Sequence, residues 1–258
     1  MSKKTGNVYV IATNKGGVGK TGATTQGAYY AAIELRKKVL LIDIEPQCNS
    51  TRMLGVNADF DQKHSSLLFD GQYEGEPLQG KHGVYVIPGD NFLNDLQKTQ
   101  DVIVNFARNI QMLSQQYDAI FIDVPPSGEP LLTAAYVVAT DVVGLLTCEQ
   151  QSVDGLEKFV TTINSFRVEV NQNMQLRGFV INLYIPRRKK QAEILRQITS
   201  DPIIGKRMVC PPIQNFGWIS DCIDAGEPVW QKLRGSGDSK ASKQFLAYLT
   251  KIYGSKRK

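Results

Sequence analysis

The segment NKGGVGKTGA at residues 14–23 follows directly on the apolar run VYVIAT at residues 8–13. Gly16, Gly17 and Gly19 let the backbone adopt positive φ and bring N–H groups close to an anion. The helical pattern that begins at Lys20 points its positive dipole end at the same place. A strand, a glycine-rich loop and a helix that starts with Lys20 and Thr21 therefore predict a phosphate-binding loop. The pattern G-x-x-x-x-G-K-[ST] is matched only loosely, because Lys15 stands near the place of its first glycine.

In such a loop Lys20 reaches the β- and γ-phosphates and the hydroxyl of Thr21 binds Mg²⁺. We therefore predict a nucleotide phosphate chain with Mg²⁺ as the ligand of this loop; the choice of ATP as the nucleotide comes from the resemblance given below. The predicted nucleotide-binding residues of the loop are Lys15, Gly16, Gly17, Val18, Gly19, Lys20, Thr21 and Gly22.

The composition is that of an ordinary globular protein. Of the 258 residues, 42% are apolar and 21% are charged, and the net charge of +5 permits an anionic partner without requiring one. The four cysteines are scattered without a C-x-x-C pair, so we expect reduced thiols. The first residues contain no apolar signal segment, and no apolar run approaches the roughly 20 residues that span a bilayer. We expect a soluble, cytoplasmic protein.

Short β-branched apolar runs alternate with segments of helical period. Strands are expected at residues 8–13, 38–44, 83–89, 118–124, 141–147 and 177–184, and helices at 20–37, 91–116, 152–170 and 190–200. The strands are apolar almost throughout, which suits a parallel sheet buried on both faces. We predict an α/β fold with a doubly wound, mostly parallel sheet, formed by residues 1–258 as one domain.

Polar side chains gather where the predicted strands end, which is the edge at which such sheets bind ligands. Asp43 and Glu45 follow the second strand and put two carboxylates near the γ-phosphate position. Asp123 ends the fourth strand and is suited to hold a water molecule on Mg²⁺. An aspartate that caps a turn, or a solvated acidic residue, is the structural alternative for each.

Three segments together make a resemblance specific. KGGVGKT at 15–21, LLIDIEPQCNST at 40–51 and YDAIFIDVPPS at 117–127 resemble the deviant Walker A, switch I and Walker B/switch II segments of the ParA/MinD family of ATPases. The likeness covers nearly the whole chain and is greatest for the small, Soj-like partition ATPases. It implies a P-loop NTPase fold in which Lys15 reaches across an ATP-sandwich dimer to the partner's phosphates.

The resemblance also implies individual roles. Lys20, Thr21 and Asp123 match the Walker lysine, the Mg²⁺ ligand and the Walker B aspartate, and Asn182 and Pro212 match residues that contact adenine. The expected catalytic residues are Lys15, Lys20, Asp43 and Glu45.

Some positions depart from the family pattern. Glu45 stands in place of the usual aspartate, Cys48 replaces a glycine and should stiffen the loop, and Gly22 stands where threonine or serine is common. We expect slow, partner-stimulated hydrolysis.

Basic and apolar residues leave two functions open. The resemblance favours non-specific DNA binding by an ATP-bound homodimer, nucleoid association and stimulation by a ParB-like protein. The predicted DNA-binding residues are Arg187, Arg188, Lys189, Lys190, Lys256, Arg257 and Lys258. The alternative is a MinD-like switch on a membrane or cargo, because the apolar residues of the last helical segment share one face: Phe245, Leu246, Leu249, Ile252 and Tyr253.

That face equally suits a helix docked on the sheet, which makes a membrane partner the less favoured expectation. A cluster-bearing redox protein of the nitrogenase-iron-protein type is disfavoured, because only Cys148 has a suitable context.

Overall fold

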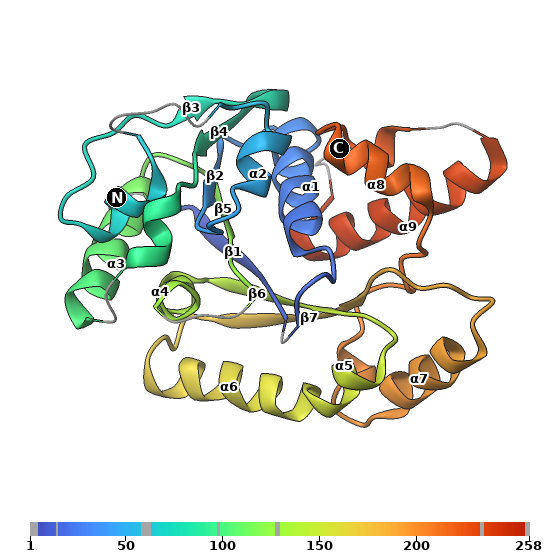
Figure 1. The fold of residues 1–258 in the computed structure, drawn as a ribbon. Helices are drawn as coiled ribbons and strands as arrows, with labels where there is room; N and C mark the ends of the chain where they lie inside the picture. Colours follow the sequence, from blue (N-terminus) through green and yellow to red (C-terminus); the bar gives the residue numbers. More distant parts are fainter. Residues whose placement is uncertain are drawn as a thin grey trace.

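The computed structural model describes residues 5–13, 15–57, 63–96, 99–126, 130–232 and 235–255, without the side chains of 235–239. Within this part of the chain, seven strands form one sheet in the order β3-β4-β2-β5-β1-β6-β7 (Figure 1). The strands are β1 Asn7–Ala12, β2 Val39–Asp43, β3 Leu78–Gln79, β4 Val84–Ile87, β5 Ala119–Asp123, β6 Asp141–Leu146 and β7 Gln175–Ile181. All neighbours pair in parallel except β3 and β4. The predicted doubly wound α/β fold is confirmed.

Helices cover both faces of the sheet (Figure 1). They are α1 Lys20–Ile33, α2 Asn49–Met53, α3 Gln100–Ser114, α4 Leu131–Val138, α5 Gln150–Asp154, α6 Leu156–Glu169, α7 Lys189–Ser200, α8 Gly217–Asp224 and α9 Gly235–Tyr253. Short 3-10 turns occur at η1 Ser65–Phe69, η2 Lys81–Gly83, η3 Asn91–Asp95, η4 Gly205–Arg207 and η5 Val229–Gln231.

Two cores result from the alternation of side chains along the strands. Val8 and Val10 of β1 pack with residues of α3, α4, α6 and α7, whereas Tyr9 and Ile11 pack with residues of α1, α8 and α9. Because both faces are covered, the strands can be apolar at every position, which is why continuous apolar runs predicted them.

The predicted helix at 91–116 is wrong as one continuous element. Asn91–Asp95 is a 3-10 turn, and α3 begins only at Gln100. The backbone is extended at Leu96, with φ −62° and ψ 124°, and again at Thr99, with φ −105° and ψ 156°. The predicted helix at 152–170 is likewise divided at Gly155 into α5 and α6. The sequence patterns also missed the short strand β3 and the helices α2, α4 and α8.

The C-terminal helix is docked on the protein. Phe245, Leu249, Ile252 and Tyr253 are buried, and Tyr253 packs edge-on against Tyr9. Leu246 is 40% exposed, so its predicted membership of the same buried stripe is wrong. Leu246 instead borders a surface hollow that Val209, Cys210 and Lys243 also line. None of the described helices is both long and apolar enough to cross a bilayer.

The four cysteines are free, and Cys48, Cys148 and Cys222 are buried. Burial raises the pKa of the Cys48 and Cys148 thiols to about 11, so both are protonated at neutral pH.

Candidate active site

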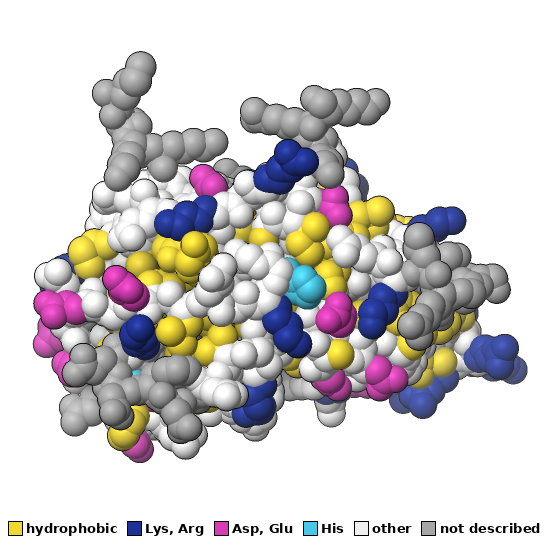
Figure 2. Space-filling model, turned by 90° about the horizontal axis from the view of Figure 1, so that it is seen from above, with side chains coloured by type: hydrophobic (Ala, Val, Ile, Leu, Met, Phe, Trp, Pro, Cys, Tyr) yellow, Lys and Arg dark blue, Asp and Glu magenta, His cyan; other side chains and the backbone are white. Residues whose placement is uncertain are grey.

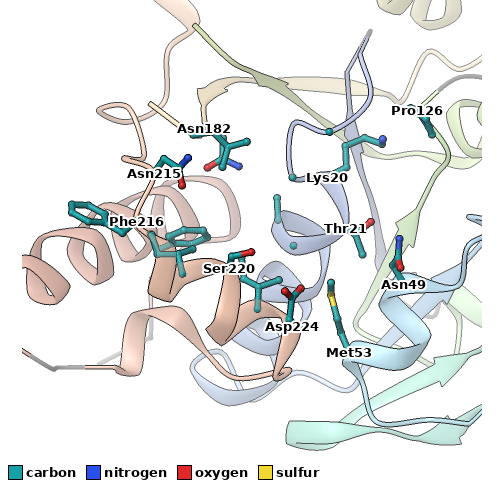
Figure 3. Close-up of a pocket in the computed structure, with 18 of the residues that line it drawn as sticks. Lys20, Thr21, Asn49, Met53, Pro126, Asn182, Asn215, Phe216, Ser220 and Asp224 are labelled. Carbon is teal, nitrogen blue, oxygen red and sulfur yellow. The ribbon is translucent and has the colours of Figure 1, made fainter. Parts of the chain in front are cut away.

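A cavity of about 660 Å³ opens at the carboxyl ends of the strands (Figure 3). The glycine loop and the start of α1 form one wall, α2 and α8 flank them, and the residues after β7 close the far end. Its polar and charged lining comprises Lys20, Thr21, Glu45, Gln47, Asn49, Asn182, Gln214, Asn215, Ser220 and Asp224. The predicted ligand edge of the sheet is therefore hollow in the structure.

The glycine loop has the conformation that its glycines permit. Gly17 and Gly19 adopt φ values of 73° and 89°, in the left-handed region. Gly19 is the N-cap of α1, and its carbonyl accepts the first helical hydrogen bond from the N–H of Ala23 at 2.9 Å. No side chain caps the helix, so its N-terminal N–H groups are available to an anion. A Cβ at Gly22 would lie 3.1 Å from Ile223 Cδ1, so glycine at this position lets α8 approach α1.

Lys20 and Asp123 are buried ionisable residues that influence each other next to the cavity. Lys20 is 8% exposed, and this burial lowers its pKa, while Asp123 and Glu45 oppose the shift. Asp123 is fully buried, and neither of its carboxylate oxygens has a hydrogen-bond partner among the described residues. Burial and the nearby Asp43 charge raise the pKa of Asp123 to about 8, against the influence of Thr21 and Lys20.

An unpartnered carboxylate beside a threonine hydroxyl and a buried lysine fits a hydrated divalent cation held next to a polyphosphate. Carboxylate and hydroxyl oxygens are the ligands that Mg²⁺ takes, and Mg²⁺ usually keeps several waters. Water on the cation would give the Asp123 oxygens the donors that the protein does not supply.

Asp43 lies directly beside Asp123 in the register of β2 and β5 but faces a different set of partners. It is fully buried and accepts hydrogen bonds from Thr51 N at 2.9 Å, Thr51 Oγ1 at 2.7 Å and Glu45 N at 3.1 Å. Burial raises the pKa of Asp43, and the Thr51 hydrogen bonds oppose this shift. Its carboxylate therefore fixes the start of α2 and does not line the cavity.

Glu45 is the acidic residue of this loop that reaches the cavity wall. It is half-buried, and burial raises its pKa while Lys20 lowers it. Cys48, three residues on, has a φ of 55° and a ψ of 36°. This is the left-handed conformation that glycine adopts without strain. A side chain at this position therefore restricts the backbone conformations that the loop can adopt, as expected from the sequence.

Lys15 forms an ion pair with Glu149. The two side chains are 30% and 48% exposed, and Glu149 immediately precedes α5, after the end of β6. The sequence patterns did not single out Glu149. A polar residue beyond a strand end was the available signal, because the same rule had found Asp43, Glu45 and Asp123.

The far end of the cavity is built from residues after β7 and before α8. Asn182 lines it, but Pro212 is not part of the lining, which takes Gln214, Asn215 and Phe216 instead. Figure 3 shows Asn182, Asn215 and Phe216 on the same side of the cavity. The loop that carries these last two residues has no period that a sequence pattern could have detected.

The predicted basic residues are exposed at the start of α7. Arg187, Arg188, Lys189 and Lys190 all face solvent. Three further exposed cations, which the sequence-based prediction did not include, are Arg196, Lys206 and Arg207 on α7 and η4. Lys256, Arg257 and Lys258 lie outside the described residues. On the face seen in Figure 2, the described Lys and Arg side chains are instead spread among acidic and apolar ones.

A glycine loop between β1 and α1, Lys20 and Thr21 at the helix start, and an aspartate at the end of the adjacent β5 define a P-loop nucleotide-binding protein. A family model described as an AAA domain matches residues 6–176. The chromosome-partitioning ATPase Soj of Thermus thermophilus is 34% identical over 182 residues, which cover 67% of this chain and 68% of Soj. The chain belongs to the ParA/MinD family of partition ATPases.

Solved structures share the fold at lower identity. The ATP complex of a single-residue variant of McdA from Cyanothece superposes with a TM-score of 0.79, at 19% identity over 99% of both chains. Cobyrinic acid a,c-diamide synthase of Mycobacterium smegmatis, solved with an ATP analogue and magnesium, has a TM-score of 0.75 at 23% identity, covering 97% of this chain and 98% of that one.

Proposed function

We propose that this protein is a Mg²⁺-dependent ATPase that dimerises on binding ATP, binds DNA non-specifically as a dimer, and helps segregate or position DNA or another cargo. Residues 1–258 act as one ATPase domain. The observation that carries the proposal is a second lysine, Lys15, in the same glycine loop that ends at the buried Lys20, with its side chain outside the cavity lining and paired with Glu149. The membership of the partition ATPase family supports it.

Lys20 and the N–H groups of the glycine loop hold the phosphates, and Thr21 and Asp123 hold Mg²⁺. When bound, Mg²⁺ neutralises charge that builds on the phosphate oxygens. Asn182 lies on the base side of the cavity, with Asn215 and Phe216. The ATP and magnesium complexes of structural neighbours support this choice of cofactors.

Glu45 orients or deprotonates the attacking water. It is the carboxylate of the β2 loop that lines the cavity, whereas Asp43 is occupied by Thr51 and by the N–H of Glu45. Lys15 supplies a cation to the partner's phosphates, as an arginine finger does in related phosphoryl transfers. The glutamate in place of aspartate and the restricted backbone at Cys48 support slow basal turnover that a ParB-like partner accelerates.

The exposed cations at the start of α7 form the DNA-binding surface, and Lys256, Arg257 and Lys258 add to it. Phosphate contacts of this kind are independent of sequence. A protein that binds DNA in this way is cytoplasmic and nucleoid-associated. A membrane-anchored switch has less support, because the large apolar residues of α9 other than Leu246 are buried in the protein.

The deciding experiment is ATP-dependent dimerisation measured by light scattering. The Lys15→Ala variant should bind ATP with little loss but fail to dimerise, because the remaining cradle still holds one nucleotide. Lys158→Ala, which removes an exposed lysine from α6, is the matched control and should dimerise like the parent. Equal dimerisation of Lys15→Ala and the parent would refute the role of Lys15 in trans.

A further inference from the structure

Asn182 is tied to the glycine loop rather than only to the far end of the cavity. Its Nδ2 donates a hydrogen bond of 2.9 Å to the carbonyl oxygen of Val18, and the asparagine is 8% exposed. The direction of this bond is fixed by chemistry, because a carbonyl oxygen can only accept. Figure 3 shows the side chain beside the loop and the start of α1.

The hydrogen bond acts on the orientation of one peptide unit. A trans peptide is planar, so the carbonyl of Val18 and the N–H of Gly19 point in opposite directions. Gly17 and Gly19, on either side of Val18, both adopt positive φ, and glycine can rotate through conformations closed to other residues. Without an anchor, the Val18–Gly19 peptide could turn over and carry the Gly19 N–H to the wrong side of the loop.

A second contact joins Asn182 to the same part of the loop, at Gly19. A Cβ built on Gly19 would lie 2.6 Å from Asn182 Nδ2, so the amide group occupies the space that a side chain at position 19 would fill. The glycine therefore serves two needs at once, a positive φ and the close approach of Asn182.

The backbone around Asn182 is itself fixed. Its N–H donates to Leu146 O of β6 at 2.8 Å, and two residues later the N–H of Tyr184 donates to Ile213 O at 3.0 Å. Between them Leu183 adopts a φ of 56°, a conformation that a leucine keeps only when its surroundings impose it. The side chain of Asn182 is thus presented to the loop from a rigid support.

We propose that Asn182 is a positioning residue of the phosphate loop: it fixes the Val18–Gly19 peptide and so aims the Gly19 N–H at the phosphates. This inference rests on the proposed nucleotide-binding function and extends it. It means that the residue at the base end of the site also sets the affinity for the phosphate chain, independently of any base.

Inorganic tripolyphosphate separates the two roles, because it has no base. Binding of tripolyphosphate and of ATP, each with Mg²⁺, should be measured by titration calorimetry for the parent, Asn182→Ala and Asn182→Leu. The loss of one well-placed hydrogen bond should weaken both ligands by about 5- to 10-fold. The leucine variant keeps the volume of the side chain and guards against a packing defect in the alanine variant.

Asn171→Ala is the matched control. Asn171 also donates its amide to backbone carbonyls, of Tyr136 at 3.0 Å and Ala139 at 2.7 Å, but it lies in the connection from α6 to β7 and not in the cavity lining. It should lower the melting temperature without changing tripolyphosphate affinity.

Weaker ATP binding with unchanged tripolyphosphate binding in both Asn182 variants would overturn the inference and leave Asn182 a base contact. An equal loss of affinity in Asn171→Ala would reduce the effect to general destabilisation and also overturn it. A parent that binds neither ligand would refute the proposed function itself, and the inference with it.

Discussion

Replacing Asp123 by asparagine should stabilise the protein in the absence of nucleotide and metal. The Asp123 carboxylate is fully buried, has no hydrogen-bond partner among the described residues, and stands beside the equally buried Asp43. Asparagine has nearly the same shape and removes the charge. A buried carboxylate without a partner is costly to keep, and this cost is the one that Mg²⁺ binding would relieve.

The magnitude follows from the pKa of Asp123, which rises from 3.8 to about 8 through burial and the Asp43 charge. A carboxyl group whose pKa is higher in the folded state favours folding at low pH and loses that contribution as the pH rises towards 8. One proton changes the free energy of unfolding by at most about 1.4 kcal/mol per pH unit. Between pH 5 and pH 8 the parent should therefore lose up to about 4 kcal/mol that the Asp123→Asn variant retains.

The assay is thermal unfolding in EDTA across this pH range. For a chain of this size 1 kcal/mol shifts the melting temperature by about 2–4 °C, so the gap at pH 8 should be on the order of 10 °C. Asp43→Asn is the matched control with the opposite sign: it disturbs three donated hydrogen bonds and should cost about 1–3 kcal/mol. Parallel pH profiles for the parent and Asp123→Asn, or a variant less stable at pH 8, would refute this reasoning.

Three further outcomes are expected. Glu45→Ala should abolish turnover and accumulate ATP-bound dimers in a phosphate-release and light-scattering assay, while Glu45→Asp should keep or raise turnover; full activity of Glu45→Ala would exclude its role. Replacing Arg187 and Arg188 together by alanine should weaken binding to unrelated DNA sequences equally, and reduce the slope of log affinity against log salt by about 2 for each subunit of the dimer that contacts the DNA. Leu249→Ala should cost about 2–5 kcal/mol in denaturant unfolding and Leu246→Ala less than about 1, because only Leu249 is buried; equal costs would contradict the docking of α9.

Sequence patterns predicted the long strands well, because strands buried on both faces are continuous apolar runs. Such a run can be recognised without knowing which strands pair with it. They failed at residues 91–116, where the helical period continues through positions whose backbone is extended at Leu96 and Thr99. The spacing of apolar residues indicates which side chains are buried. A 3-10 turn followed by a helix can bury the same side chains as one continuous helix, so the spacing does not distinguish the two.

The candidate site was predictable where its functional side chains lie at the end of a strand. Glycine, Lys20 and Thr21 have fixed spacing within one loop, and Asp123 has a fixed place beside it in a parallel sheet. The difference between Asp43 and Glu45 could not be read from the sequence, since it depends on the hydrogen bonds that Thr51 donates from the following helix. Gln214 and Phe216 reach the cavity only through the path of an irregular loop.

In the dimerisation proposed above, the ion pair between Lys15 and Glu149 would make the transfer of Lys15 to the other subunit an exchange reaction. The monomer already gives Lys15 a negative partner, so crossing to another subunit replaces one ion pair by another and gains only the difference between them. A nucleotide that ends in a γ-phosphate offers the lysine more negative charge than one that ends at the β-phosphate. Breaking the pair with Glu149 would cost the same whichever nucleotide the partner holds, so Glu149 weakens dimerisation as a whole and the difference between ATP and ADP comes from the charge of the γ-phosphate.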